Sequence, residues 1–486
     1  MCDLVISMRS KLFYSASMLV AGAFSLISKT NASQPNVIII YADDLGYGDV
    51  SCYGATKIKT PNIDLLAEQG KRFTDSHAPA TVCSPSRYGL LTGRSPWRLN
   101  KSGNGYRIED DRFNLAKLFK SKGYVSAAIG KWHLGYSKDW NKLPIKGPLD
   151  VGFDYHFGVP QNHNDNTRCY IENDDIYGRE VGVPFRIVKG KDFPEGVAKP
   201  RVDDQVDTML TNKSIDFIKL NAERPFFLYF SPVATHTHIT PAEEFRGTSE
   251  AGLLGDYVQE LDSHVGRIMN TLEELKIADK TLLIFTSDNG GSYKDFKGTN
   301  GVKLNLASEA GGVIEGFKTA KADARKMGHS CNGIYRDGKG HPEEGGHRVA
   351  FIARWPKVIP AGTTSDYTCM HTDIMSTIAE ILNTELPDNS AEDSISMLSI
   401  LTSPQDTPRV ARTIYVQGDT KNNAIAICSG RWKMIAGKGS DDVPAVQLYD
   451  LHADPFETKN LVAENPDLVT EMLAGLKKAR AAGRTR

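Results

Sequence analysis

The sequence predicts an α/β protein in which a large, mainly parallel (mixed) sheet is sandwiched by helices, followed by a small C-terminal α+β domain with an antiparallel sheet. Three observations predict this fold class. Several short apolar runs lack polar alternation, which is typical of strands buried on both faces of a parallel sheet. Stretches with helical periodicity separate these runs, as in βαβ units. After about residue 392, strand-like pieces follow one another closely and one helix ends the chain.

The elements are expected in the following order. The strands of the large sheet are residues 36–41, 124–129, 225–230 and 281–286. The helices between them are residues 62–69, 114–121 and 256–275. Residues 294–327 are rich in Gly and Lys with weak periodicity, so we expect a long surface loop there. The C-terminal domain has expected strands at 413–416, 424–427 and 432–435 and an expected helix at 466–481.

The N-terminus has the pattern of a secretion signal. A basic stretch at 8–11 precedes an apolar segment at 12–28 and small residues at 30–32. This order predicts a signal peptide at 1–32 and a secreted or periplasmic mature chain. An uncleaved membrane anchor is the alternative. Because the apolar segment is shorter than the roughly 20 residues of a membrane span, we expect no stable membrane insertion.

The overall charge argues against binding to nucleic acid. Lys and Arg total 58 and Asp and Glu total 59, whereas nucleic-acid-binding proteins normally carry a basic excess. A near-neutral total still permits a locally basic pocket for an anion. The seven cysteines show neither a C-x-x-C metal pattern nor a dense disulfide framework.

Acidic residues follow two of the expected buried strands. Asp43 and Asp44 come after the first strand, and Asp288 and Asn289 come after the strand at 281–286. Sites in open α/β sheets form at the carboxyl ends of strands. Four side-chain oxygens converging there would suit a hard divalent cation such as Ca²⁺. Taken singly, each pair is better explained as a loop cap or Asx-turn; two pairs at two strand ends favour a metal site.

The segment at 83–94, CSPSRYGLLTGR, combines a cysteine with a site for an anion. Pro85 suits the first turn of a helix, which places Cys83 just before the helix N-terminus. The backbone amides and the helix dipole favour an anion at that end. Arg87 lies about one turn further on and adds a permanent positive charge. The alternative is a buried structural cysteine in a helix cap.

These motifs resemble a known family. Residues 83–87 followed by Leu-Thr-Gly-Arg at 91–94 resemble the first signature of the type I, formylglycine-dependent sulfatases, and GKWHLG at 130–135 resembles the second. Further segments resemble the family in the same order, at 61–64, 234–236, 287–290, 336–340 with 344–346, and 448–451 with 454–455. The resemblance covers nearly the whole mature chain. It implies an alkaline-phosphatase-like fold, with a catalytic domain at 33–391 and a C-terminal subdomain at 392–486.

The resemblance also implies roles for individual residues. A maturation enzyme oxidises Cys83 to formylglycine, and its hydrate attacks the sulfate ester. Asp43, Asp44, Asp288, Asn289 and the modified Cys83 hold one Ca²⁺. The implied catalytic residues are Cys83, Arg87, Lys131, His133, His236 and Lys339. Among them, His133 is the base that releases sulfate and His236 faces the leaving oxygen.

The sequence departs from the family pattern at a few positions. Thr235 and His238 stand where the family often has proline beside the implied leaving-group histidine. Asp337 adds an acid beside the anion site, and Pro342 with Glu343 replaces a common aromatic element. We expect the extra acid to narrow substrate choice.

Details at 234–236, 247–249 and 255–257 resemble the branch that contains galactosamine-6-sulfatase and many bacterial polysaccharide sulfatases. The implied substrate is a sulfated carbohydrate in a glycan. Candidate sugar contacts, each of which could equally be solvated surface, are Tyr106, Arg107, His163, Asn164, Asp165, Arg168 and Lys303.

Two other functions stay open at this stage. One is a phosphonate or phosphate ester hydrolase of the same superfamily, and the other is an inactive glycan-binding homologue. The single-metal acid set with Lys131 and His133 favours sulfate, and every expected catalytic position is filled. The sugar, the sulfate position and the oligomeric state do not follow from the sequence.

Overall fold

The computed structural model describes residues 34–99, 105–136, 142–165, 167–182, 198–294, 304–307, 314–404, 412–418, 424–437 and 445–486. The expected signal peptide at 1–32 and the candidate sugar contact Lys303 lie outside these ranges. Among the described residues, no helix is long and apolar enough to cross a membrane. The six cysteines in these ranges are free thiols.

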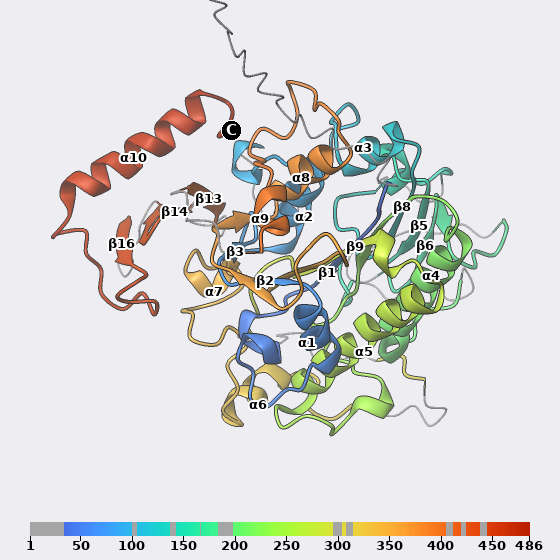
Figure 1. The fold of residues 1–486 in the computed structure, drawn as a ribbon. Coiled ribbons are helices and arrows are strands. Elements are labelled where there is room, and N and C mark those ends of the chain that lie inside the picture. Colours follow the sequence, from blue (N-terminus) through green and yellow to red (C-terminus); the bar gives the residue numbers. More distant parts are fainter. Residues whose placement is uncertain are drawn as a thin grey trace, which may run out of the picture. The chain divides into compact units, whose positions relative to one another are not determined.

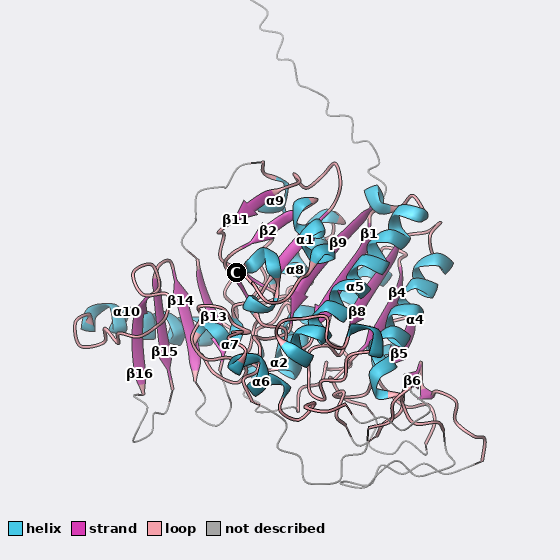
Figure 2. Cartoon of the chain, turned by 90° about the horizontal axis from the view of Figure 1, so that it is seen from below, coloured by secondary structure: helices cyan, strands magenta, loops and turns pink. Residues whose placement is uncertain are grey.

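A ten-stranded sheet forms the centre of the fold (Figure 2). Its strand order is β11-β2-β10-β9-β1-β8-β4-β5-β6-β7. The five strands β9, β1, β8, β4 and β5 run parallel, whereas β10, β6 and β7 join their neighbours in antiparallel fashion. The strands are β1 (Asn36–Ala42), β2 (Lys71–Phe73), β4 (Val125–Gly130), β5 (Tyr155–Gly158), β6 (Ile171–Glu172), β7 (Asp175–Ile176), β8 (Phe226–Ser231), β9 (Thr281–Ser287), β10 (Phe351–Arg354) and β11 (Thr363–Ser365). The predicted mixed, mainly parallel sheet is therefore confirmed.

The composition of β1 follows from its place at the centre of the sheet. Val37, Ile39 and Tyr41 enter the hydrophobic core on one face. Ile38 and Ile40, which alternate with them, enter the core on the other face. Both sets are fully buried, so the positions from 37 to 41 have to be apolar. Each such side chain contributes about 1.5–3 kcal/mol relative to exposure.

Helices cover both faces of this sheet (Figure 1). One face carries α1 (Pro61–Glu68), α4 (Val206–Leu220) and α5 (Gly252–Glu274), whose apolar residues belong to one core cluster. The other face carries α2 (Cys83–Thr92), α3 (Leu115–Ser121), α8 (Asp373–Ile381) and α9 (Leu398–Thr402), which share the second cluster. A short parallel pair, β3 (Ser76–His77) with β12 (Cys369–Met370), forms a separate two-stranded sheet. The sandwich of helices and sheet is as predicted.

A four-stranded antiparallel sheet follows near the C-terminus, in the order β13-β14-β15-β16. It consists of β13 (Thr413–Gln417), β14 (Ile425–Ser429), β15 (Trp432–Ala436) and β16 (Val446–Asp450), and α10 (Pro466–Ala481) packs on it. Lys433 of β15 is fully buried and lies 2.9 Å from both Glu344 of α7 (Glu344–His347) and Glu457. The domain boundary at 392 stays a prediction. Leu401 of α9, which follows that boundary in the sequence, packs into the core of the large sheet.

The expectation of a surface loop at 294–327 is wrong for its last part. Helix α6 (Ala320–Lys326) lies there and packs on α5. Ala320 and Ala324, four residues apart, are buried on one face of α6. A pair of alanines is too weak a hydrophobic pattern to indicate a helix from the sequence. Residues 295–303 and 308–313 of this stretch lie outside the described ranges.

Candidate active site

The two acidic strand ends meet at one edge of the sheet. β1 and β9 are parallel neighbours, and Ala42 is level with Ser287. The residues that follow them are therefore adjacent. The backbone amide of Asp44 donates to Asp288 Oδ1 at 3.1 Å, and Asn289 Nδ2 donates to Asp44 Oδ1 at 2.9 Å. The predicted convergence of the four side chains is thus present, and all four are buried.

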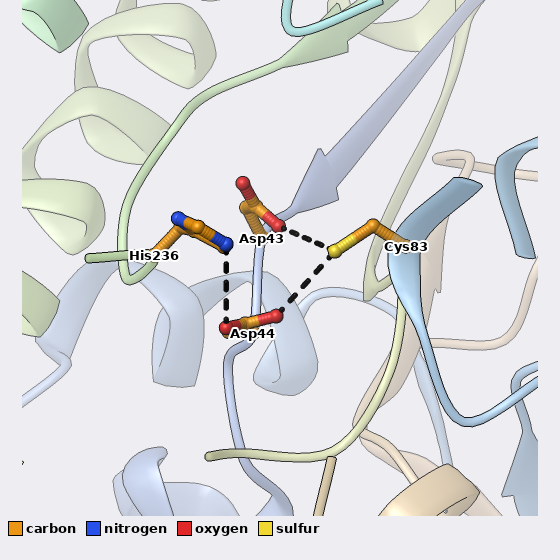
Figure 3. Close-up of side chains that lie close together, drawn as sticks. All are labelled: Asp43, Asp44, Cys83 and His236. Atoms are coloured by element: carbon orange, nitrogen blue, oxygen red, sulfur yellow. Dashed lines mark hydrogen bonds and ion pairs between the residues drawn. The ribbon is translucent and has the colours of Figure 1, made fainter. Parts of the chain in front are cut away.

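Cys83 faces this edge from the start of α2 (Figure 3). Val82, in extended conformation, is the N-cap, so Cys83 is the first helical residue rather than the residue before the helix. Its Sγ lies 3.4 Å from Asp43 Oδ1 and 3.6 Å from Asp44 Oδ1. Burial, followed by the nearby charge of Asp288, raises the pKa of the Cys83 thiol.

Arg87 lies one turn into α2 and is fully buried. Its Nη2 donates to Asp288 Oδ2 at 2.7 Å, and its Nη1 donates to the Lys131 carbonyl at 3.0 Å and to the hydroxyl of Ser231. A guanidinium keeps its charge under these conditions. Arg87 therefore places a permanent positive charge behind Cys83.

Two lysines contact the first pair of acids. Lys131 Nζ donates to both carboxylate oxygens of Asp43, at 2.8 and 2.7 Å. Lys339 Nζ donates to Asp44 Oδ2 at 2.8 Å and to Cys83 Sγ at 3.3 Å. Burial opposes ionisation of Asp44, but Lys339 and the other cations hold the pKa of Asp44 well below its usual range. The site therefore combines carboxylates with ammonium groups at hydrogen-bond distance.

Gly130, the last residue of β4, sets the direction of the backbone that leads to Lys131. Its φ is +115°, and a Cβ added there would lie 1.9 Å from the backbone oxygen of Ser231 on the neighbouring strand. Any larger residue would push β4 and β8 apart at the point where the site begins. Glycine is therefore required at this position.

Two histidines complete the group that the sequence predicts. Burial, followed by Lys131 and Arg87, holds the pKa of His133 well below its usual range, and its Nδ1 has no hydrogen-bond partner among the described residues. His236 Nδ1 donates to the Thr237 carbonyl at 2.7 Å, which leaves Nε2 facing Asp44 Oδ2 at 4.0 Å. Burial and Lys339 lower the pKa of His236, and Asp44 opposes that shift. Both imidazoles are thus neutral in the free site.

The residues at the strand ends fit a hard divalent cation. The ligand atoms of Asp43, Asp44, Cys83 and His236 all lie within 4.8 Å of one another. Asn289 Oδ1 is a buried acceptor with no hydrogen-bond partner among the described residues. A buried amide oxygen without a donor, beside carboxyl groups, is what a Ca²⁺ or Mg²⁺ site requires. Burial and, after it, the charge of Asp43 raise the pKa of Asp288. A bound cation would relieve this repulsion between the two carboxylates.

One cation at the site was not predicted. Lys321, the second residue of α6, is only 4% exposed, and its Nζ lies 3.9 Å from Asp44 Oδ2. The sequence carried no signal for it, because it belongs to the Gly- and Lys-rich stretch that was expected to form a loop.

The candidate sugar contacts have varied surroundings. Tyr106 is buried and donates to Gln417 Oε1 at 2.9 Å, and Arg107 donates to the Tyr136 carbonyl. His163 is buried, with Nε2 2.8 Å from the Thr240 hydroxyl and its ring 6.1 Å from that of His238. The remaining described candidates are Asp165, which accepts from Arg201 at 3.1 Å, Arg168, which pairs with Asp203, and Asn164, which is half-buried. A substrate role for these residues stays a prediction.

Comparison with known proteins gives the family. The sulfatase family model matches residues 35–384, and a model of the N-sulphoglucosamine sulphohydrolase C-terminal region matches residues 339–482. The chain belongs to the sulfatase family. It is a sulfuric ester hydrolase with the alkaline-phosphatase-like fold, as the motifs at 83–94 and 130–135 implied.

This sulfatase resembles several characterised relatives. The N-acetylgalactosamine-6-O-sulfatase of Bacteroides thetaiotaomicron is 34% identical, covering 91% of this chain and 92% of the relative. Human arylsulfatase A is 30% identical over 92% of this chain and 87% of its own. A solved Bacteroides thetaiotaomicron structure, described in work on the metabolism of multiple glycosaminoglycans, has a TM-score of 0.81 and 32% identity, covering 92% of this chain and 99% of its own. The phosphonate monoester hydrolase of Agrobacterium radiobacter shares the fold, with a TM-score of 0.63 at 19% identity, covering 92% of this chain and 96% of its own.

Proposed function

We propose that this sulfatase removes sulfate from a sugar in a glycan, using a formylglycine made from Cys83 and one bound Ca²⁺. The observation that carries the proposal is the position of Cys83. Its Sγ lies at a helix N-terminus, within 3.6 Å of two buried carboxylates and 3.3 Å from the Lys339 ammonium. These contacts support a nucleophile that lies beside both a metal site and a positively charged site for an anion.

The metal would be held by Asp43, Asp44, Asp288 and Asn289, together with the modified residue 83. Their oxygens match the preference of Ca²⁺ for carboxylate and amide ligands. When bound, the cation supplies positive charge that draws electron density from the sulfate oxygens. The unpartnered Asn289 Oδ1 is the observation that supports this ligand set.

Formylglycine explains how sulfate can leave without attack by water. Its hydrate carries two hydroxyls on one carbon. One of these oxygens would bond to sulfur as the bond between sulfur and the sugar oxygen breaks, and the proton that the attacking hydroxyl loses would balance the proton that the sugar oxygen gains. Loss of the proton of the second hydroxyl would then let the C–O bond to the sulfate break and the aldehyde return, and water would hydrate the aldehyde again. A serine would instead form a stable sulfate ester at this position.

The surrounding residues supply charge and protons for these two steps. Arg87, Lys131 and Lys339 neutralise the attacking hydroxyls and the sulfate. His236 presents Nε2 to the site and is placed to protonate the departing sugar oxygen, because a bound anion raises the pKa of a nearby imidazole. His133 has a free Nδ1 and a low pKa, which suits a base that accepts the proton of the second hydroxyl.

A sulfated carbohydrate is supported as the substrate by the names of the relatives. Those at 30–34% identity include an N-acetylgalactosamine-6-O-sulfatase and a dog N-acetylgalactosamine-6-sulfatase. We therefore propose that a sulfated sugar of a glycosaminoglycan or an algal polysaccharide is the substrate. We also propose that a formylglycine-generating enzyme modifies Cys83 and that the protein is secreted or periplasmic.

The proposal is tested by producing the protein in a host that makes formylglycine. Intact-peptide mass spectrometry across residue 83 should show the aldehyde. A panel of sulfated oligosaccharides, aryl sulfates and matched phosphonate esters should release sulfate fastest from a sulfated sugar. Cys83→Ala should abolish turnover, whereas Cys52→Ala, at a partly buried cysteine, should leave it unchanged.

Three results would contradict the proposal. An unmodified thiol in active enzyme would remove the mechanism. Turnover of aryl sulfates alone would remove the carbohydrate substrate, and faster turnover of phosphonates would favour the rival ester hydrolase.

A further inference from the structure

The segment that carries Lys339 brings two acids and a histidine together beside the active site. Asp337 lies two residues before Lys339, His341 lies two residues after it, and Glu343 follows. The ligand atoms of these three side chains, two carboxylate oxygens and an imidazole nitrogen, all lie within 4.8 Å of one another. Asp337 and Glu343 are also two of the positions at which the sequence departs from the family pattern.

The backbone of this segment is tightly folded, which fixes the points from which the three side chains extend. The Gly345 amide donates to the Arg336 carbonyl at 2.8 Å. A Cβ added at Gly345 would lie 2.2 Å from the carbonyl oxygen of Asp337, and one added at Gly346 would lie 1.8 Å from that of His341. The turn therefore packs directly on the backbone of Asp337 and His341.

The carboxylate of Glu343 is the observation that points to a bound ligand. The residue is only 6% exposed, and its Oε2 is a buried oxygen with no hydrogen-bond partner among the described residues. Its Oε1 lies 3.8 Å from Arg336 Nη2, which is too long for a hydrogen bond. A carboxylate that is buried in this way is unfavourable unless a cation binds to it closely.

Arg336 balances only part of the negative charge of this cluster. Its Nε lies 3.4 Å from Asp337 Oδ2, so one guanidinium faces both carboxylates. Its Nη1 donates to the Glu457 carbonyl at 2.7 Å and to the Tyr449 hydroxyl at 3.1 Å, which directs that side of the guanidinium towards the C-terminal sheet. Two carboxylates beside one guanidinium leave a negative charge that a divalent cation would neutralise.

The histidine determines which class of cation fits. Ca²⁺ and Mg²⁺ prefer oxygen ligands, whereas Zn²⁺ binds imidazole together with carboxylates. We propose that Asp337, His341 and Glu343 form a second metal site, which binds a divalent transition-metal ion of the Zn²⁺ class. The ion would join the residues on either side of Lys339. This site shares no ligand with the Ca²⁺ of the proposed function, so each can fail without the other.

The test measures Zn²⁺ binding by calorimetry, in excess Ca²⁺ so that the active-site acids are occupied. It compares the wild type with His341→Ala and Glu343→Gln, and His452→Ala, at an exposed histidine, is the matched control. We expect the wild type to bind Zn²⁺ and each of the two variants to lose at least about tenfold in affinity, because each lacks one ligand. His452→Ala should bind Zn²⁺ as the wild type does, and Mg²⁺ should compete poorly.

Thermal unfolding gives a second readout. Zn²⁺ should raise the melting temperature of the wild type in a concentration-dependent way and do so less for His341→Ala. The inference would be overturned by a wild type that binds no Zn²⁺, or by equal Zn²⁺ affinity in the wild type and both variants. Loss of the site in Asp44→Asn, with His341→Ala unaffected, would also overturn it, since the ion would then lie in the active site. Zn²⁺ binding through His341 and Glu343 in a protein that hydrolyses no sulfate ester would support the inference and refute only the proposed function.

Discussion

Glu260 of α5 offers a sharp test of the electrostatics behind the His236 loop. It is 1% exposed, and its Oε2 accepts a hydrogen bond from the Ala242 amide at 2.8 Å. The Nε2 of His264, one turn further along the helix, lies 3.3 Å from Oε1. Burial, together with the charges of Glu244 and Asp204, raises the pKa of Glu260 to about 8, although the hydrogen bond from the Ala242 amide acts in the opposite direction. The folded protein therefore favours the neutral acid.

The sign and size of the effect follow from proton linkage. Between the ordinary glutamate pKa of about 4.5 and the folded value, the folded state binds the extra proton, so stability falls as pH rises. From pH 5 to pH 8 this one group should lower the free energy of unfolding by about 3–4 kcal/mol. Glu260→Gln keeps an acceptor for the Ala242 amide and cannot ionise, so it should not show this loss.

The assay is urea unfolding at several pH values, with the free energy extrapolated to water. The wild type and Glu260→Gln should differ little at pH 5, and the variant should be the more stable protein at pH 8. Glu274→Gln, at an exposed position of the same helix, is the control and should follow the wild type. Parallel curves for the wild type and Glu260→Gln across this range would refute the reasoning.

Three further predictions concern buried charge, backbone space and the metal. Lys433→Met leaves the buried Glu457 carboxylate without its cation and Glu344 with Arg348 alone, and should cost about 3–5 kcal/mol in urea unfolding, whereas Lys459→Met, at an exposed pair, should cost less than about 1 kcal/mol; equal losses would contradict this. Gly130→Ala should lower kcat as well as the melting temperature, because its Cβ would collide with the neighbouring strand, while Gly123→Ala, also at positive φ but in open space, should lower only the melting temperature. Added Ca²⁺ should raise the melting temperature of the chelator-treated wild type in a concentration-dependent way and do so less for Asn289→Ala; an equal rise in both would argue against that ligand.

The central strands could be predicted because they are buried on both faces. The expected strands at 36–41, 124–129, 225–230 and 281–286 match β1, β4, β8 and β9 within one residue at each end. Strands towards the two ends of the sheet were missed because they are short and carry polar residues. β2 is Lys71–Phe73 and β6 is Ile171–Glu172, and neither has room for a periodic pattern.

The residues of the site also fall into those whose positions could be predicted from the sequence and those whose positions could not. The side chains of Cys83 and Arg87 could be placed together because both lie in the first turns of one helix. Lys321 could not be placed, because its position depends on α6 packing against α5 rather than on any local signal. The burial of Glu260 could not be predicted either. An acidic residue in the sequence of an amphipathic helix is normally expected on the exposed face, and Glu260 is buried.

The burial of Cys83 has a consequence for the order of events during synthesis. The thiol is 3% exposed in the folded chain, and one of the groups that contact it, Lys339, comes 256 residues later in the sequence. At roughly 5–20 residues per second, a ribosome needs on the order of tens of seconds to add that length. During this interval the pocket around Cys83 is incomplete. If residue 83 is oxidised as proposed, that delay is the period in which a maturation enzyme reaches the thiol without first unfolding the protein.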